Sequence, residues 1–276
     1  MLPFEKKNQI LVCVDSDGTI MDTMTVKHER CFGPMLFRVF SVEGMEHEIL
    51  NHWLHVNLYS TQRGINRFQG LDEICHFMAD KYHVSISGLD EFDEWVTTTK
   101  ELSVKSMNQY RQSCMNDSLF VKAEKWSSLV NEAIRNLEPS KPFSGVTEIL
   151  SALNGIADLV GVSSANREAV EEEWNRVGII SLFSYVGCQD IGNKTLIIKN
   201  AMESGYDKKN VIMLGDALGD KDAAEKNGVR FFPIVPKHEI ESWERFYSEA
   251  FPKLSDNQFT DDYQERLNED FINALR

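Results

Sequence analysis

The stretch Ile10-Leu-Val-Cys-Val-Asp15-Ser-Asp17-Gly-Thr19 decides the fold of this chain. Its first five residues form a short, continuously apolar run rich in β-branched side chains, which predicts a buried parallel strand. The strand ends at Asp15, and a second carboxylate follows at Asp17 before a glycine that permits a sharp turn. In parallel α/β sheets, ligands bind beyond the carboxyl ends of the strands. The sequence therefore predicts a carboxylate site directly after the first strand.

Later segments repeat this alternation of strands and helices. Residues 159–162, 211–214 and 229–235 are apolar runs of strand length. Residues 146–153, before the first run, and residues 170–177, between the first two runs, carry apolar side chains at helical spacing. Strands that alternate with helices predict an α/β fold, here a doubly wound, Rossmann-like parallel sheet.

The pattern changes in two regions. Residues 24–138 contain long polar and apolar segments with many aromatic residues and few strand-like runs, which predicts an inserted, mainly helical domain. Two prolines near residue 140 mark the return to the core, so we expect a discontinuous core of residues 1–23 and 139–235. Apolar residues recur at helical spacing in residues 236–276, which predicts a helical extension docked on the core.

Composition limits the kinds of partner. With 276 residues and 42% hydrophobic content, the chain can bury a core. Its net charge of -14 opposes nonspecific attraction to nucleic acid or anionic membranes. Neither a signal peptide nor an apolar stretch of membrane-spanning length is visible, so we expect a cytoplasmic protein. Its five scattered cysteines, without a CxxC pair, predict reduced thiols.

Two carboxylates this close together can divide the work of phosphoryl transfer. A carboxylate at Asp15 can attack phosphorus to give an acyl phosphate, while Asp17 can protonate the leaving oxygen and then activate water. A solvated turn would explain a lone pair of this kind equally well. The other polar segments must decide between the two interpretations.

A second carboxylate pair follows the strand predicted at 211–214. Asp216 and Asp220 lie four residues apart across a glycine-rich loop. Mg²⁺ prefers oxygen ligands and needs only a few carboxylates beside water and substrate phosphate. Asp15 and Asp216, with help from Asp220, can form such a shell. Asp220 can also cap the helix that follows it.

Ser163 and Lys194 are candidates for contacts with a phosphoryl group. The Ser163 hydroxyl, at the end of the strand predicted at 159–162, can donate a hydrogen bond to a phosphoryl oxygen before a helix N-terminus. Ser164 and Asn166 are further candidates for substrate binding, although such residues often serve only as helix caps. Lys194 could balance charge between carboxylates and phosphate, whereas a lone lysine is usually a solvated surface residue.

In chain order, VDSDGT, VSSAN, Lys194 and GDALGD resemble the four signatures of the haloacid dehalogenase-like superfamily. The resemblance covers the core and not the insert. It implies an insert of the C1 cap type, which closes over the site and chooses the substrate. It also implies Mg²⁺ as cofactor and a small phosphorylated metabolite as substrate.

The resemblance assigns roles to the candidate residues. It implies that Asp15 is the nucleophile and that Asp17 is the general acid/base and a metal ligand through its backbone carbonyl. Ser163 and Lys194 would contact the phosphoryl group. Asp216 would bind the metal, and Asp220 would support that shell.

The type of reaction follows mainly from Asp17. Dehalogenases of the superfamily typically lack this acidic residue and bind no Mg²⁺, so a Mg²⁺-dependent phosphohydrolase acting through an aspartyl-phosphate is favoured. A phosphonate hydrolase would need a cap lysine, for which Lys27 is a minor candidate. A phosphomutase of the same superfamily and a noncatalytic phosphate-binding or regulatory protein are the two alternatives that stay open. The motifs do not indicate the oligomeric state.

In the predicted cap, Arg63 and Arg67 are the candidates for reading the leaving group. Their guanidinium groups would share a helix face if the segment is helical, and they suit a phosphate or carboxylate. Surface ion pairing with Asp72 or Glu73 is the competing interpretation. Gly64 between the arginines is also compatible with a loop.

Overall fold

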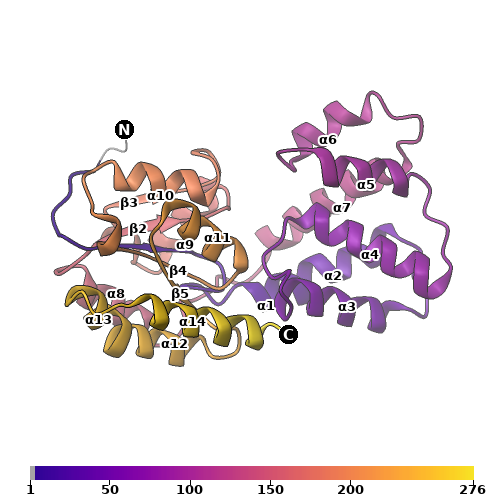
Figure 1. Ribbon diagram of the computed structural model, residues 1–276. Coiled ribbons are helices and arrows are strands. Elements are labelled where there is room, and N and C mark those ends of the chain that lie inside the picture. The colour runs from indigo at the N-terminus through magenta and orange to yellow at the C-terminus, as the bar shows by residue number, and fades with distance from the viewer. Residues whose placement is uncertain (1–3) are drawn as a thin grey trace. The chain divides into compact units, whose positions relative to one another are not determined.

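The computed structural model describes residues 4–276, and the chain divides into two compact units. Unit 1 consists of Met1–Met24 and Pro139–Arg276, and unit 2 consists of Thr25–Glu138. Figure 1 shows a sheet flanked by helices in unit 1 and helices alone in unit 2. Residues 1–3 of the predicted first core segment lie outside the described residues.

Unit 1 is built around a parallel sheet with the strand order β3-β2-β1-β4-β5. The strands are β1 (Leu11–Val14), β2 (Asp158–Val162), β3 (Tyr185–Gly187), β4 (Val211–Gly215) and β5 (Arg230–Pro233). The first strand lies at the centre, where Leu11 pairs with Asp158 of β2 and with Val211 of β4. Every residue of β1, β2 and β4 is buried, as the continuous apolar runs require. The predicted α/β fold with a parallel sheet is confirmed.

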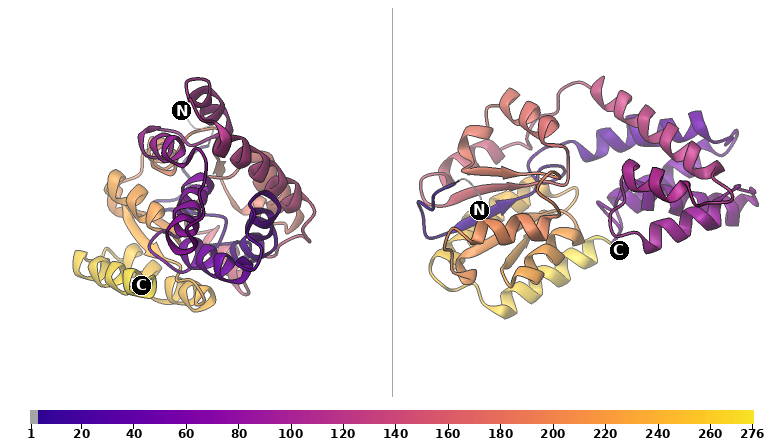
Figure 2. Two further views of the ribbon diagram at one scale, coloured as in Figure 1. Left: turned by 90° about the vertical axis from the view of Figure 1, so that its right-hand side faces the viewer. Right: turned by 90° about the horizontal axis from the view of Figure 1, so that it is seen from above.

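Helices cover both faces of this sheet (Figure 2). They are α8 (Val146–Leu153), α9 (Arg167–Arg176), α10 (Lys194–Met202), α11 (Leu218–Asn227), α12 (Glu239–Arg245), α13 (Phe251–Ser255) and α14 (Asp261–Ala274). The described part of the unit also contains the short helices η2 (Ile180–Leu182), η3 (Lys208–Asn210) and η4 (Phe246–Ala250). Because side chains alternate along a strand, Val12 and Val14 face one core while Leu11 and Cys13 face the other.

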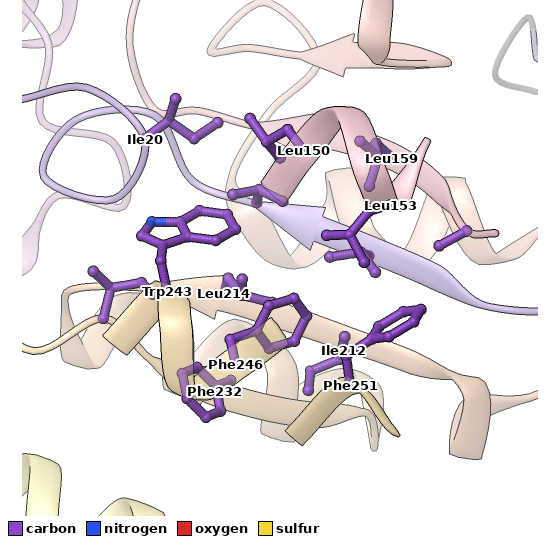
Figure 3. Close-up of a cluster of buried hydrophobic side chains, with 14 of the residues drawn as sticks. Ile20, Leu150, Leu153, Leu159, Ile212, Leu214, Phe232, Trp243, Phe246 and Phe251 are labelled. Atoms are coloured by element: carbon purple, nitrogen blue, oxygen red, sulfur yellow. The ribbon is translucent and has the colours of Figure 1, made fainter. Parts of the chain in front are cut away.

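The larger core of unit 1 joins the sheet to α8, α9 and the C-terminal helices. Figure 3 labels its central side chains: Ile20, Leu150, Leu153, Leu159, Ile212, Leu214, Phe232, Trp243, Phe246 and Phe251. The opposite face packs against α10 and α11 through Ile197, Ile198, Ala223 and Ala224. The residues after Pro236 therefore supply a large part of the larger core, the one that contains Val12 and Val14 of β1.

The last helix closes the edge of the sheet. Tyr263 of α14 belongs to the larger core and Phe271 to the opposite one, so this helix passes along the edge strand β5. The Gln264 side chain donates to the Phe231 carbonyl at 2.8 Å and accepts from the Phe231 N–H at 2.9 Å. These bonds occupy backbone groups that an open edge strand would expose for pairing with another chain.

Unit 2 is helical throughout. Its elements, with the short helix that leads into it, are α1 (Met24–Lys27), η1 (His28–Phe32), α2 (Gly33–Val39), α3 (Glu46–Leu58), α4 (Arg67–Tyr82), α5 (Leu89–Thr98), α6 (Val104–Arg111) and α7 (Ser118–Arg135). Its core contains three fully buried indoles, Trp53, Trp95 and Trp126. Over residues 4–276, no helix has both the length and the apolar character that crossing a membrane requires.

Two segments of unit 1 that lead to and from unit 2 are hydrogen-bonded to each other. The Asp22 N–H donates to the Lys141 carbonyl at 3.0 Å, and the Phe143 N–H donates to the Ile20 carbonyl at 2.9 Å. Between these bonds, Met21 and Pro142 form an antiparallel bridge. The loop that follows β1 is therefore fixed at its far end as well as at the strand.

Candidate active site

Asp15 lies where the central strand ends. Its backbone N–H donates to the Leu214 carbonyl of β4 at 3.0 Å, which continues the pairing of the two strands by one residue. The residue is 6% exposed. The sheet therefore presents the Asp15 carboxylate at the carboxyl ends of two neighbouring strands, as the sequence predicts.

The chain turns back sharply after Asp15. The Ser16 carbonyl accepts hydrogen bonds from the N–H groups of Ile20 and Met21 at 3.0 and 2.9 Å. Gly18 has a φ of 78°, a value that few residues with a side chain adopt, and its N–H donates to the Met21 carbonyl. Asp17, on this loop, is half-buried and its carboxylate accepts a hydrogen bond from the Thr23 hydroxyl.

Asp216 and Asp220 follow β4. The Thr19 hydroxyl donates to Asp216 Oδ1 at 3.0 Å. Asp220 is fully buried in the first turn of α11, where its Oδ2 accepts from the Ala217 N–H at 3.1 Å. Helix α11 begins at Leu218, earlier than the sequence suggests, so Asp220 binds the helix N-terminus from inside the first turn.

Three carboxylates meet at this end of the sheet. One oxygen each from Asp15, Asp216 and Asp220 lies within 4.8 Å of the other two, and all three residues are buried. Buried carboxylate oxygens are the hard donors that Mg²⁺ prefers. The group can therefore hold a metal ion. The expected metal contact through the Asp17 backbone carbonyl remains a prediction.

Lys194 joins two of these carboxylates. It is the first residue of α10, whose N-terminus is capped by the Asn193 side chain. The Lys194 Nζ lies 2.8 Å from Asp15 Oδ1 and 2.6 Å from Asp220 Oδ1, and its side chain is 17% exposed. The structure thus places this lysine among the carboxylates and not in solvent.

The electrostatics of the cluster are unbalanced toward negative charge. Burial raises the pKa of Asp15 well above its usual range, Lys194 opposes this, and Asp220 and Asp216 add to it. Burial also raises the pKa of Asp220, again against the effect of Lys194. Burial alone would lower the pKa of Lys194, but Asp15 and Asp220 outweigh it and raise that pKa. Because one ammonium serves several buried carboxylates, a divalent cation fits the charge of this site.

Ser163, Ser164 and Asn166 follow β2. The Ser163 N–H donates to the Gly187 carbonyl at 2.9 Å, and its hydroxyl accepts from the Ala165 N–H at 3.1 Å. Ser164 is exposed. Asn166 caps α9, where its side chain accepts from the Glu168 N–H at 2.9 Å. Contacts of these side chains with a substrate remain predictions.

The two candidate arginines of unit 2 lie in different elements. Arg63 is buried in a turn before α4, and its guanidinium donates to the Leu58 carbonyl at 2.8 Å. Arg67 is the first residue of α4 and donates to Ser127 at 3.1 Å and Asn131 at 2.8 Å. The idea of a shared helix face is therefore wrong, because the chain turns at Gly64, where φ is 73°.

The competing ion pairs that the sequence suggests have other partners. The Nε2 of His76 lies 3.7 Å from Oδ2 of Asp72, and the Nε2 of His52 lies 3.6 Å from Oε1 of Glu73. Asp72, His76 and Asp93 are also close enough to one another to hold an ion, but the last two side chains are nearly half exposed. Such surface groups commonly form simple ion pairs, and we treat them so.

Three residues of the site region are not predicted from the sequence. Thr19 reaches Asp216, Trp174 Nε1 donates to the Ser16 hydroxyl oxygen at 3.0 Å, and Trp243 Nε1 donates to the Thr19 carbonyl at 2.8 Å. Partners in these contacts are separated by 158 to 224 positions. No local pattern in the sequence signals contacts of this range.

A parallel sheet with buried carboxylates at the ends of its strands is typical of α/β proteins with an acidic site that can hold a metal ion. Comparison with protein families identifies the family to which the chain belongs. The sequence model of haloacid dehalogenase-like hydrolases matches residues 65–234, which is more than half of the chain. The chain belongs to this family. The match does not include β1, so the role of Asp15 remains a prediction from the sequence motif.

Solved structures show the same fold at low sequence identity. A protein from Lactobacillus delbrueckii subsp. bulgaricus, assigned as a phosphoglycolate phosphatase, is 14% identical, with 82% of this chain and 85% of that chain covered and a TM-score of 0.51. A protein from Haemophilus somnus with the same assignment is 16% identical, with 81% and 84% covered and a TM-score of 0.51. A magnesium-bound hydrolase of the superfamily from Bacillus subtilis is 14% identical, with 82% and 86% covered and a TM-score of 0.46. The search of curated proteins found no significant match.

Proposed function

We propose that this protein is a Mg²⁺-dependent phosphohydrolase that cleaves a small phosphomonoester through an aspartyl-phosphate on Asp15. One observation carries the proposal: Lys194 bridges Asp15 and Asp220 inside a buried carboxylate group that also contains Asp216. A buried nucleophile beside a fixed ammonium and metal-binding carboxylates is the arrangement that phosphoryl transfer needs. The cytoplasmic location expected from the sequence remains a prediction.

The proposed reaction has two steps. In the first, an Asp15 oxygen attacks phosphorus, the bond from phosphorus to the leaving oxygen breaks, and Asp17 gives that oxygen a proton. In the second, Asp17 takes a proton from water as the water oxygen attacks the same phosphorus. The bond between phosphorus and the Asp15 oxygen breaks, so that inorganic phosphate leaves and the Asp15 carboxylate is restored. The hydrogen bond from Thr23 orients the Asp17 carboxylate on its loop.

The residues around Asp15 prepare it for the first step. A nucleophilic carboxylate must be ionised, and the Lys194 ammonium favours that state against the effect of burial. Asp15, Asp216 and Asp220 would hold Mg²⁺, which when bound supplies positive charge to the phosphoryl oxygens. Ser163 would donate its hydroxyl hydrogen to one of those oxygens.

Substrate choice belongs to unit 2 in this proposal. The assignment as phosphoglycolate phosphatase applies to the two similar structures themselves. For this chain the proposal extends to a small phosphorylated metabolite. Ser164 and Asn166 are proposed as further substrate contacts, and Arg63 and Arg67 as the groups that read the leaving portion.

The test of the mechanism is Asp15→Asn, assayed by release of inorganic phosphate from p-nitrophenyl phosphate with Mg²⁺. We expect turnover to vanish, because an amide cannot form the acyl phosphate, while the nearly isosteric side chain preserves the fold. Asp158→Asn, which alters another buried carboxylate of the same sheet, is the matched control. Substantial residual turnover at unchanged thermal stability would rule out Asp15 as the nucleophile. Isomerisation of a sugar phosphate without phosphate release would instead indicate a mutase.

The proposed role of unit 2 is tested with Arg63→Ala. We expect a loss of kcat/KM for the best substrate found by screening phosphorylated sugars, nucleotides and small acids, with a much smaller loss for p-nitrophenyl phosphate. Equal losses on both substrates, at equal folded fraction, would show that Arg63 does not read the leaving group.

A further inference from the structure

Two buried indoles hold the loop that carries the proposed nucleophile. Trp174 of α9 donates its N–H to the Ser16 hydroxyl oxygen, and Trp243 of α12 donates its N–H to the Thr19 carbonyl at 2.8 Å. Both tryptophans are 0% exposed. Because a buried carbonyl without a donor is costly, the bond from Trp243 fixes the backbone at Thr19.

The same Thr19 also contacts the carboxylate group. Its hydroxyl donates to Asp216 Oδ1 at 3.0 Å, in a fully buried contact. Thr19 therefore accepts from the C-terminal region through its main chain and donates to Asp216 through its side chain. A change in the Thr19 backbone would redirect the hydroxyl, and the Asp216 carboxylate would lose this hydrogen bond.

Trp243 is itself held in place. Figure 3 shows its indole within the core between strand and helix side chains. The ring packs edge-on against Phe246, with centroids 6.0 Å apart. The preceding residue, Ser242, links α12 to the segment that follows β5, because its hydroxyl accepts a hydrogen bond from the Val235 N–H at 3.0 Å. The indole N–H thus has a fixed direction before any ligand binds.

We propose that Trp243 is a positioning residue that orients the metal-binding carboxylate of Asp216 through Thr19. Trp243 lies beyond residue 234, where the match to the family ends. The region after Pro236 is then part of the working site and not only a cover for the sheet. The proposal rests on the proposed function in one respect, namely that Asp216 binds Mg²⁺.

The first test compares Trp243→Phe with Trp95→Phe. Both tryptophans are fully buried, but the N–H of Trp95 has no hydrogen-bond partner within residues 4–276. The two substitutions therefore remove the same atoms, and only one removes a hydrogen bond. Outer-shell partners of metal ligands typically change affinity by 10- to 100-fold. For Trp243→Phe, one bond further out, we expect about tenfold weaker Mg²⁺ binding by calorimetry, with no change for Trp95→Phe.

A second test asks whether Trp243 acts through Thr19. Thr19→Val removes the hydroxyl at nearly constant shape, and Thr19→Ser retains it. We expect weaker Mg²⁺ binding for Thr19→Val and recovery for Thr19→Ser. In the double variant Trp243→Phe with Thr19→Val, the two losses should not add, because both break one chain of contacts. Additive losses would overturn the proposed route.

If Trp243→Phe does not fold, benzothienylalanine at position 243 keeps the two-ring shape without the N–H. Unchanged Mg²⁺ affinity in that protein would overturn the proposal, whatever the effect on thermal stability. A wild-type protein that binds Mg²⁺ but hydrolyses no phosphomonoester would defeat the proposed function alone, since the affinity test would still report on Trp243. A wild-type protein that binds no Mg²⁺ would overturn this inference directly.

Discussion

Gly215 and Asp220 pack so closely that a methyl group on Gly215 would lie 2.2 Å from Cγ of Asp220. Only the absence of a side chain at the end of β4 lets the first turn of α11 fold back over it. The Asp220 carboxylate reaches Lys194 from this position. The glycine is therefore a condition for the geometry of the carboxylate cluster.

We expect Gly215→Ala to displace Asp220 and to impair both stability and Mg²⁺ binding. Overpacking of this kind typically costs about 1–3 kcal/mol of the free energy of unfolding, which urea denaturation measures. Gly155→Ala is the control, because no other group lies within 4 Å of the added methyl group. A Gly215→Ala protein with wild-type stability and Mg²⁺ affinity would show that α11 moves at no cost.

Mg²⁺ should stabilise the protein, and more so at pH 7.5 than at pH 5. Burial raises the pKa of Asp15 in the metal-free folded protein. The contribution of Asp15 to stability is therefore complete below its pKa in the unfolded chain and is lost as pH rises through its pKa in the folded protein. Mg²⁺ competes with this proton. At a hundredfold excess over Kd the ion adds about 2.7 kcal/mol. Thermal melts with and without Mg²⁺ at both pH values check this. Asp216→Asn should show a smaller effect.

Lys194→Met should destabilise the metal-free protein. It removes the ammonium that Asp15 and Asp220 share, and loss of one partner of a buried ion pair costs about 3–5 kcal/mol. The loss should shrink at acid pH, because the carboxyls then become protonated. Lys199→Met, on the exposed face of the same helix, controls for the loss of one lysine. Equal melting temperatures for the two variants at pH 7.5 would contradict the expectation.

Asp158 is a buried carboxylate with a structural role. Its Oδ2 accepts from the N–H groups of Lys7 and Asn8 at 2.9 and 2.8 Å, and the Tyr206 hydroxyl donates to the same oxygen. We expect Asp158→Ala to lower stability by about 2–4 kcal/mol, because three donors lose their acceptor and one of them, the Tyr206 hydroxyl, is buried. Turnover per folded molecule should not change. A fall in kcat/KM at full folding would refute this separation.

Asp72 should make the stability of unit 2 depend on pH. Burial, offset by His76 and reinforced by Asp93, raises its pKa to about 6. Its contribution to stability is therefore complete below the unfolded pKa and is lost as pH rises through about 6. We expect Asp72→Asn to gain stability relative to wild type at pH 7.5 and to gain less at pH 5. Urea denaturation at both pH values measures this. A larger gain at pH 5 than at pH 7.5 would show that the attraction of His76 outweighs the effect of burial on the pKa of Asp72.

The parts of the fold that the sequence predicts are those with a strong local signal. The strands β1, β2 and β4 are continuous apolar runs, and three of the four motifs follow them directly, Lys194 being the exception. Strand β3, with only three residues and a partly exposed tyrosine, carries too little pattern to be recognised. The strand order also places Asp15 beside Asp216, since their strands are neighbours at the centre of the sheet.

Other features depend on tertiary contacts that no local pattern encodes. The sequence indicates that Lys194 belongs to the site by its place between two motifs, but not that it bridges Asp15 and Asp220. The segment from Arg63 to Arg67 has helical spacing, yet the positive φ at Gly64 breaks it into a turn and a helix. The bond between Trp243 and Thr19 spans 224 positions and follows only from the packing of α12 on the sheet.

The central position of β1 has a consequence for the order of folding. Its partners in the sheet begin at Asp158 and Val211, so the whole of unit 2 is synthesised between β1 and either neighbour. The helices of unit 2 depend on contacts that are near in sequence and can form early. During synthesis β1 stays an unpaired apolar segment until its partner strands have been made. The site at Asp15 can therefore assemble only after translation has passed β4, and until then the nascent chain is open to aggregation or chaperone binding.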